Sequence, residues 1–358
     1  MPGHDQERDA FADRVFASAL GYFDVLTIHL GRRLGLYGAL AELGPASPAE
    51  LAERAGIAER YAREWLEQQA TAGILRADVG PDVTRFELPV GHAEVLLDGD
   101  SLSFMGSSVM QLMSLRGAFD HVVEAFRTGA GVPYEAYGVD GVEGQGGANR
   151  PIFLTTLPEE WLPAIPEVHD RLSSDGEARI LDVGCGTGWS SIAMATAYPN
   201  VTVEGFDPDP TSVELARRNA EAAGLGDRVR FHAKDAAALA VDGPAAFATA
   251  FECIHDMANP VEVLRAVHRS LDPSGTMLIV DEKTKDAFTG EPDELEAYFY
   301  GWSVLDCLPS GMYQQPSAAT GAVMRPETLR GYASEAGFGD VEVLPIDDDA
   351  FRLYLLRR

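Results

Sequence analysis

The feature that most constrains this chain is a glycine-rich segment at residues 179–189, with the sequence RILDVGCGTGW. It predicts a short apolar strand, a helix that begins near Ser190, and between them a turn with glycine at alternate positions, Gly184, Gly186 and Gly188. Such a turn lets a ligand lie against bare backbone, because a Cβ would block the approach, and some of its residues need positive φ. The segment therefore predicts a strand–turn–helix unit that binds a ligand in an α/β fold.

An acidic residue distinguishes this turn from the glycine-rich turn of dinucleotide-binding enzymes. The dinucleotide pattern requires its third glycine where this chain has Trp189, whereas here an aspartate enters the loop and glycine follows at every second position. The pattern resembles that of class I S-adenosylmethionine-dependent methyltransferases. The resemblance implies S-adenosylmethionine as cofactor, S-adenosylhomocysteine as its product, and a binding loop formed by Asp182, Gly184, Gly186 and Gly188.

Two further strands end in an acid, and both support this resemblance. Residues 201–207 predict a strand that ends in Asp207, whose carboxylate can accept hydrogen bonds from both ribose hydroxyls of a nucleoside. Residues 228–235 predict a strand that ends in Asp235, and the resemblance implies that this acid faces the adenine amino group. The three motifs follow one another at intervals of about 25 residues, as βα units require. Together they predict a Rossmann-like domain.

Length and apolar content indicate a globular protein of two domains. The chain has 358 residues, too many for one typical core, and 46% of them are hydrophobic. No apolar run approaches the roughly 20 residues that span a bilayer. The polar N-terminus lacks the basic-then-apolar pattern of a signal peptide. We therefore expect a cytoplasmic protein without a membrane partner.

Charge and cysteine content exclude other classes of site. The chain carries 28 basic and 56 acidic residues, a net charge of −28, so it repels phosphate backbones and we expect no nucleic-acid partner. Its three cysteines, Cys185, Cys253 and Cys307, lack metal-ligand spacing, and their odd number argues against a disulfide framework. We expect small buried side chains at these positions and no metal.

The first hundred residues predict a winged-helix domain. Apolar residues recur at helical spacing over 11–43, and a capping box at residues 47–50 opens a helix over 48–55. A second helix over 59–72 and a β-hairpin over 73–88 complete the helix–turn–helix–wing order. We place this domain at residues 1–100.

A winged helix raises the question of DNA binding, and charge argues against it. The candidate recognition helix carries three acidic and two basic residues, and residues 45–80 hold six acidic and four basic residues. In small-molecule O-methyltransferases of secondary metabolism, which the chain resembles, the same domain serves dimerisation. The resemblance therefore implies a homodimer, with the apolar stretches 11–30 and 102–126 as candidate surfaces.

Residues 101–172 predict a helical linker followed by a lid. Apolar residues over 102–126 mark one long amphipathic helix, whose methionines either line an apolar substrate pocket or only fill the core. Residues 129–147 are too rich in glycine and too polar for a core, so we expect a loop or lid there. Its neighbourhood offers three candidate substrate-binding residues, Tyr137, Asn149 and Arg150.

Residues 173–358 predict the catalytic domain. Strands expected at 179–183, 201–206, 229–233, 246–252 and 276–280 alternate with helices, as in a parallel sheet. The resemblance implies a seven-stranded methyltransferase sheet whose antiparallel edge pair corresponds to residues 340–345 and 351–356. Residues 283–325 are too long for a simple connection and carry many aromatics, so we expect a cap over the substrate, with Tyr298 and Trp302 as candidate contacts. Alternatively, these aromatics only pack the insertion onto the domain.

The candidate catalytic residues follow the fourth and fifth strands, because ligands bind beyond the carboxyl ends of such strands. There the chain has Glu252, a candidate cofactor contact, then His255 and Asp256, and after the next strand Glu282. Histidine suits removal of a hydroxyl proton near neutral pH, and a carboxylate can orient it. The pair His255–Asp256 resembles the His–Asp pair of plant-type O-methyltransferases, although a different sequence follows it. The alternatives are that His255 only bonds a neighbouring loop, that Asp256 caps the next helix and that Glu282 is an exposed loop acid.

Three functions remain open from the sequence. The first is methyl transfer from S-adenosylmethionine to a hydroxyl of a small metabolite, with His255 as general base. The second keeps the cofactor but transfers the methyl group to nitrogen or carbon. The third is a transcriptional regulator that senses S-adenosylmethionine and binds DNA through its winged helix, which the acidic charge disfavours.

Overall fold

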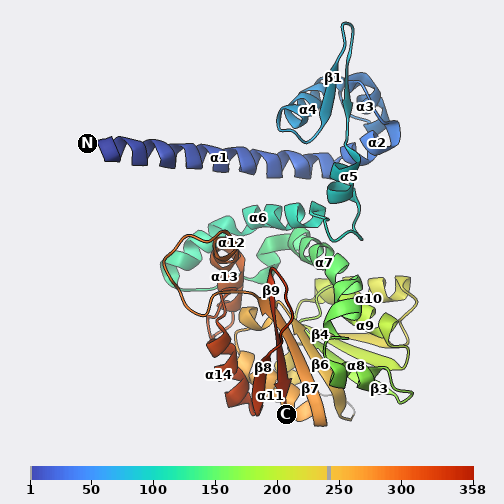
Figure 1. Ribbon diagram of the computed structural model, residues 1–358, viewed down its shortest axis with the longest axis vertical. Helices are drawn as coiled ribbons and strands as arrows, with labels where there is room; N and C mark the ends of the chain where they lie inside the picture. The colour runs from blue at the N-terminus through green and yellow to red at the C-terminus, as the bar shows by residue number, and fades with distance from the viewer. Residues whose placement is uncertain (1, 240–242) are drawn as a thin grey trace. The chain divides into compact units, whose positions relative to one another are not determined.

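The computed structural model describes residues 2–239 and 243–358 (Figure 1). The chain divides into two compact units, Met1–Met113 and Ser114–Arg358. The division falls inside helix α6 (Gly106–Thr128), so most of the expected linker region belongs to the second unit. Among the described residues, no helix is both long and apolar enough to cross a membrane.

The first unit has the predicted order of helix, turn, helix and β-hairpin. Its elements are α1 (Pro2–Arg33), α2 (Leu36–Leu43), α3 (Pro48–Ala55), α4 (Glu59–Thr71), β1 (Arg76–Val79), β2 (Thr84–Glu87) and α5 (Val90–Leu97). The expected capping box is present, because the Ser47 hydroxyl accepts from the Glu50 N–H and the Glu50 carboxylate accepts from the Ser47 N–H. Tyr37 and Trp65 meet edge to face in the core, with ring centroids 5.1 Å apart.

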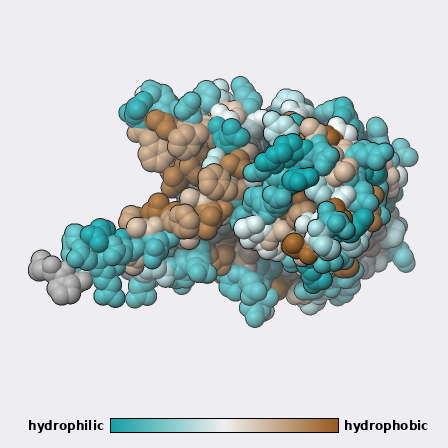
Figure 2. Space-filling model, turned by 90° about the horizontal axis from the view of Figure 1, so that it is seen from above, coloured by the Kyte–Doolittle hydropathy of each residue, from teal (hydrophilic) through white to brown (hydrophobic). Residues whose placement is uncertain are grey.

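Helix α1 leaves much of its apolar surface exposed within this unit (Figure 2). Its 32 residues make it about 48 Å long at 1.5 Å per residue. Its exposed apolar side chains are Phe11, Val15, Phe16, Leu20, Tyr22, Phe23 and Leu30. An apolar surface of this kind is unusual on a helix face that lies in water.

The second unit is built on the expected seven-stranded sheet. Its strands are β3 (Ala178–Val183), β4 (Val201–Asp207), β5 (Val229–Ala233), β6 (Ala245–Phe251), β7 (Leu271–Glu282), β8 (Asp340–Val343) and β9 (Phe351–Arg357). Their spatial order is β5-β4-β3-β6-β7-β9-β8. The first five are parallel and the last two pair antiparallel, so the predicted antiparallel edge pair is confirmed.

Helices cover both faces of this sheet (Figure 1). One core contains α8 (Pro166–Leu172), α9 (Trp189–Ala197) and α10 (Pro210–Ala222), and the other contains α11 (Pro260–Ser270) and α14 (Pro326–Ala336). The alternation of the strands explains the two cores, because Ile180 of β3 belongs to the first and Leu181 to the second. Strand order changes direction between β3 and β6, where ligands bind in folds of this class.

The loop predicted over residues 129–147 is wrong, because most of it is helical. A short 3₁₀ turn, η1 (Tyr134–Tyr137), leads into α7 (Gly138–Leu154), and a π turn, η2 (Leu157–Trp161), follows. Close packing explains two of its glycines. A Cβ at Gly141 would lie 3.4 Å from the Ser114 hydroxyl, and one at Gly146 only 2.1 Å from the Thr187 hydroxyl.

The insertion after β7 is partly helical. It contains α12 (Glu294–Trp302), a π turn η5 (Ser303–Cys307) and α13 (Leu308–Gly311). It packs on the segment that follows β6, since the Gly321 N–H donates to the His255 carbonyl at 3.1 Å and the Ala318 N–H to the Ala258 carbonyl at 2.8 Å. A Cβ at Gly311 would lie 2.9 Å from the Asp256 carbonyl oxygen. The insertion therefore covers the histidine segment directly.

Candidate active site

The three glycines of the turn after β3 all have positive φ, as expected, but they serve different purposes. Gly184, Gly186 and Gly188 have φ of 66°, 49° and 83°. A Cβ on Gly184 would lie 2.6 Å from the Cys253 sulfur, and one on Gly188 would lie 2.6 Å from the Phe231 ring. A Cβ on Gly186 would meet nothing within 4 Å. Gly186 is thus the residue whose bare backbone faces open space, and the other two allow close packing.

Asp182 lies beneath the turn and holds it in place. Its side chain is fully buried, and one carboxylate oxygen accepts from the hydroxyls of Ser190 and Ser191 at 2.6 Å each. The other oxygen accepts from the Thr249 hydroxyl at 2.8 Å. Burial raises the pKa of Asp182 despite these bonds. Asp182 therefore connects the start of α9 to the neighbouring strand β6.

Asp207, at the end of β4, faces the turn. One of its oxygens accepts from the Gly186 N–H at 3.0 Å and the other from the Asp209 N–H at 2.9 Å. Burial raises the pKa of Asp207 to about 6, and the two N–H donors oppose this shift. Asp235, after β5, is exposed, and its carboxylate accepts from the Ala237 N–H at 2.8 Å.

Glu252 follows β6 with a backbone conformation that is rare for a residue with a side chain. Its φ is 49°, and its N–H donates to the Val280 carbonyl at 2.8 Å. Its carboxylate bonds the side chain of Gln145 on α7. Burial, followed by the negative charge of Glu282, raises the pKa of Glu252 to about 8. Strained backbone of this kind persists where the surrounding structure over-determines it, often at functional sites.

His255 is buried between carboxylates. Its Nδ1 lies 2.9 Å from an Asp281 carboxylate oxygen and 3.1 Å from a Glu282 oxygen, and its Nε2 lies 3.2 Å from an Asp256 oxygen. The ring is 1% exposed. Asp281 Oδ2 is buried and makes no hydrogen bond within the described structure. The side chain is therefore oriented from both ring nitrogens, in a cluster with acceptor capacity to spare.

Burial and the neighbouring carboxylates shift the pKa of His255 in opposite directions. Burial lowers the pKa of His255, but Asp281, Glu282 and Asp256 together raise it well above its usual range. Burial raises the pKa of Glu282 to about 7, while the neighbouring histidine opposes this shift. The three carboxylates therefore favour the protonated imidazole, and burial opposes them.

The π turn η5 brings further polar groups to the histidine. Burial and the nearby Asp256 raise the pKa of Asp306 to about 7, and Asp306 also bonds the Tyr137 hydroxyl. The thiol of Cys307 bonds His255, and burial raises the pKa of this thiol. The sets His255/Asp281/Glu282 and His255/Asp256/Cys307 each bring three possible metal ligand atoms within 4.8 Å of one another.

The predicted substrate-binding residues occupy different surroundings. Tyr137 is 4% exposed and its hydroxyl donates to the Leu305 carbonyl at 2.9 Å, so it ties η1 to the insertion. Arg150, on α7 beside Asn149, lies over the ring of Trp189, 4.6 Å from its centroid. Tyr298, half exposed, meets Trp302 edge to face on α12.

Sequence reasoning missed three residues of the cluster. Asp281 directly precedes the predicted Glu282, so its place at the carboxyl end of β7 was the available signal. Asp306 lies in the insertion, where neither motif nor periodicity marked it. Gln145 fell within the segment wrongly predicted as a loop. The alternative in which Asp256 caps α11 is not seen, because Asn259 occupies the N-cap position and does so without a side-chain bond.

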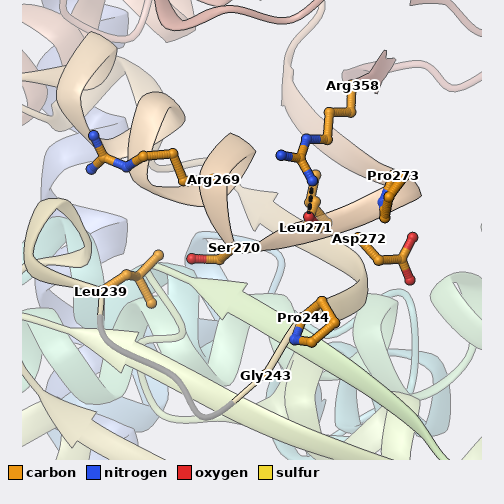
Figure 3. A pocket seen from close by; sticks show the side chains of 9 residues that line it. All are labelled: Leu239, Gly243, Pro244, Arg269, Ser270, Leu271, Asp272, Pro273 and Arg358. Atoms are coloured by element: carbon orange, nitrogen blue, oxygen red, sulfur yellow. Dashed lines mark hydrogen bonds between the residues drawn. The ribbon is translucent and has the colours of Figure 1, made fainter.

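A separate surface hollow of about 430 Å³ lies away from this site. It is lined by residues before β6 and around the start of β7, and the Arg358 side chain bonds the Leu271 carbonyl at its edge (Figure 3). These are the amino ends of the strands, whereas the glycine turn, Asp207 and His255 lie at the carboxyl ends. The hollow therefore has no part in the site described here.

Comparison with known proteins identifies both units. Residues 174–315 match a family described as "Methyltransferase domain", and residues 24–97 match the "Rv2258c-like winged HTH domain". The chain is 25% identical over 333 residues to N,N-dimethyltransferase OxyT of Streptomyces rimosus, covering 88% of each protein. It is 34% identical over 183 residues to O-methyltransferase rstn1 of Aspergillus nomiae, covering 51% of this chain and 73% of that protein.

Solved structures share the fold over nearly the whole chain. The mitomycin 7-O-methyltransferase MmcR matches with a TM-score of 0.70 at 21% identity, over 98% of this chain and 99% of that one. Human N-acetylserotonin methyltransferase, solved in complex with S-adenosylmethionine, matches with a TM-score of 0.72 at 17% identity, over 97% of each chain.

The chain belongs to the S-adenosylmethionine-dependent methyltransferases and carries an N-terminal winged-helix domain. Its residues fit this cofactor. Gly186 offers bare backbone beside open space, the carboxylate of Asp207 stands at the same turn, and Glu252 is held in a strained conformation at the next strand end. The dinucleotide alternative is thereby set aside, and the expected methyltransferase family is confirmed.

Proposed function

We propose that this enzyme methylates a hydroxyl of a small metabolite and that His255 accepts the hydroxyl proton. The observation that carries the proposal is the buried contact of 2.9 Å between His255 Nδ1 and Asp281, at the carboxyl ends of β6 and β7. A histidine oriented by a carboxylate is the usual arrangement for removing a proton from an alcohol or phenol. The matching methyltransferases named above include O-methyltransferases, which supports a hydroxyl acceptor.

The side chains around His255 have separate roles in this reaction. When bound, S-adenosylmethionine supplies an electrophilic methyl group. Asp281 and Glu282 fix Nδ1 of His255 as the protonated nitrogen, which leaves Nε2 as the atom that accepts a proton. Nε2 faces Asp256, whose side chain is 39% exposed, so the acceptor hydroxyl approaches beside this carboxylate or in its place. The insertion packs on the histidine segment and the His255 ring is 1% exposed, which limits the access of bulk water.

Replacement of the histidine tests this role. With the hydroxylated aromatic acceptor that gives the highest turnover in a compound screen, His255→Gln should lower kcat about 100-fold or more. Binding of S-adenosylhomocysteine, measured by calorimetry, should change little. The control His121→Gln alters an exposed histidine of α6 and should leave both quantities unchanged. An unaltered kcat for His255→Gln would exclude this residue as the base.

A nitrogen acceptor is the second candidate. It is favoured by the match to an N,N-dimethyltransferase over 88% of both chains. A buried carboxylate with spare acceptor capacity, such as Asp281, also suits a cationic amine. An amine whose lone pair is free needs no base, so His255→Gln should cost it little rate. The same variant therefore separates the two candidates when hydroxylated and amino-bearing acceptors are compared.

We also propose that the enzyme is a homodimer. The support is the exposed apolar surface of α1, defined by the side chains named above, which a monomer would leave in water. The winged-helix domain is then a dimerisation module, and not a DNA reader. Helix α4 supports this view, because its arginines Arg60 and Arg63 pair with Glu64 and Glu59 of the same helix.

A further inference from the structure

Asp281, the carboxylate nearest to His255, has a second oxygen that the histidine does not use. Its Oδ1 lies 2.9 Å from His255 Nδ1 and accepts from the Glu282 N–H at 3.1 Å. Its Oδ2 is buried and makes no hydrogen bond within the described structure, and the residue is only 1% exposed. A buried ionised oxygen without a partner is costly, so a compensating positive group is expected close to it.

The neighbouring strand places an arginine opposite this carboxylate. Arg352 of β9 pairs with Asp281 of β7 in the antiparallel ladder, and residues directly opposite have Cβ atoms about 4.5–5.5 Å apart. Both side chains leave the sheet on the face covered by α11 and α14, because Ile279 and Tyr354, two residues along each strand, belong to that core. The guanidinium and the carboxylate are therefore cross-strand neighbours on one face of the sheet.

The guanidinium also has a hydrogen-bonding atom to spare. Nη1 of Arg352 is buried and makes no hydrogen bond among the residues that the structure describes. Nη2 lies 3.7 Å from an Asp286 oxygen, but the Asp286 side chain is 89% exposed, so water screens this pair. Burial raises the pKa of Tyr354, the bonded Arg352 opposes this shift and Asp281 adds to it, so both charges act on one hydroxyl. The cross-strand pair thus combines a buried donor and a buried acceptor, each without a partner.

We propose that Arg352 is a positioning residue for the methyl transfer, whose guanidinium compensates Asp281 at Oδ2 and keeps Oδ1 directed at Nδ1 of His255. In this role it acts through Asp281 and touches neither the cofactor nor the acceptor. The effect on rate rests on the proposed function, in which His255 is the base. The effect on the histidine itself does not, and it can be measured without an acceptor.

Removal of this cation changes the titration of the histidine in a definite direction. A positive charge beside Asp281 disfavours the uptake of a proton by the carboxylate and by His255 behind it. Without that charge, both groups bind a proton at higher pH. The other titratable groups that face these residues are unchanged in the variants below: Asp256, Glu282, Glu252, Cys253, Asp306, Cys307 and Tyr354, with Arg330 of α14 beyond Tyr354.

The test is an NMR titration of histidine-labelled protein, in which the His255 signal is identified by its loss in His255→Gln. Arg352→Gln removes the charge and should raise the titration midpoint of His255 by about one pH unit. The acid limb of kcat/KM should move to higher pH by the same amount. Arg352→Lys keeps the charge and should restore most of the midpoint. In Asp281→Asn protein, Arg352→Gln should move the midpoint much less, because the carboxylate that links the two is neutral.

A second arginine of the same strand is the control. Arg357 pairs with Glu342 and Glu167 at the other end of β9, at 2.7 and 2.8 Å, so Arg357→Gln should leave the His255 midpoint unchanged. If Arg352→Gln is too unstable to titrate, the double variant with Asp281→Asn should be the more stable in urea, because no buried charge is then unpaired.

Three results would overturn the proposal. They are an unmoved midpoint in Arg352→Gln, an equal shift with and without the Asp281 charge, and a double variant no more stable than an Arg352→Gln protein that cannot be titrated. A midpoint that moves as expected while the acid limb of kcat/KM stays in place would instead overturn the base role of His255.

Discussion

Three carboxylates determine the pH range in which His255 can accept a proton. Asp281, Glu282 and Asp256 raise the pKa of this histidine well above its usual range, although burial opposes them. A general base works only in its neutral form, so the rate falls as the pH drops below this raised pKa. Activity that depends on His255 should therefore increase from neutral toward alkaline pH.

Asp281→Asn tests this electrostatic control. Asp281 Oδ1 lies 2.9 Å from His255 Nδ1 and accepts from the Glu282 N–H at 3.1 Å. The amide of the variant keeps one oxygen that can accept both hydrogen bonds, but it has no negative charge. The pKa of His255 then falls, and the acid limb of kcat/KM should move to lower pH by about one to three units. A pH–rate profile measures this. An unmoved limb would mean that another group titrates.

The cluster also shows which residues the sequence can reveal. Glu252, His255 and Glu282 were predicted because each follows a strand whose carboxyl end is a general place for ligands. Asp281 lies at the same strand end and makes the shortest carboxylate contact with His255. Whether Asp281 or Glu282 contacts the histidine more closely depends on the direction of their side chains at the end of β7, which the sequence does not reveal. Asp306 approaches from an insertion, and no local pattern encodes such a long-range contact.

At the scale of elements, α7 shows how tertiary packing overrides composition. Its five glycines and one proline are poor helix formers, so the sequence favours a loop. The helix forms because its glycine face meets neighbouring elements closely, as at Gly141 and Gly146. By contrast, the strands of the sheet had regular apolar patterns and were predicted to within two residues, except that β7 begins at Leu271, five residues before the predicted start.

The pair Gly146→Ala and Gly331→Ala separates packing from helix propensity. In α7 the new methyl group would strike the Thr187 side chain and should destabilise the fold by about 1–3 kcal/mol. In α14 nothing lies within 4 Å of the added Cβ, and the same change should stabilise by up to about 1 kcal/mol. Urea unfolding measures both. Equal effects of the two variants would show that α7 does not press on the loop.

At the scale of the whole molecule, local signals explain why the strands were predicted but their spatial order was not. Each parallel strand has its own apolar run, whereas the antiparallel edge pair was implied by the family resemblance, and the order β5-β4-β3-β6-β7-β9-β8 comes from the structure. The position of the boundary between the two units was harder to predict from the sequence, because α6 is one continuous helix that crosses it. A continuous helical pattern carries no signal of where one core stops and the next begins.

The assembly proposed for this enzyme depends on α1, and charge placed on that helix tests it. Phe16→Asp combined with Leu20→Asp puts two carboxylates on the exposed apolar surface, where they would be buried unpaired in a dimer. The molar mass from light scattering should fall to half, while circular dichroism stays the same because these side chains are 67% and 50% exposed within the unit. Val90→Asp, at a site that is 87% exposed on α5, should leave the mass unchanged. If the double variant keeps the mass of a dimer, α1 does not form the interface; if the unaltered protein already has the mass of one chain, the homodimer itself is excluded.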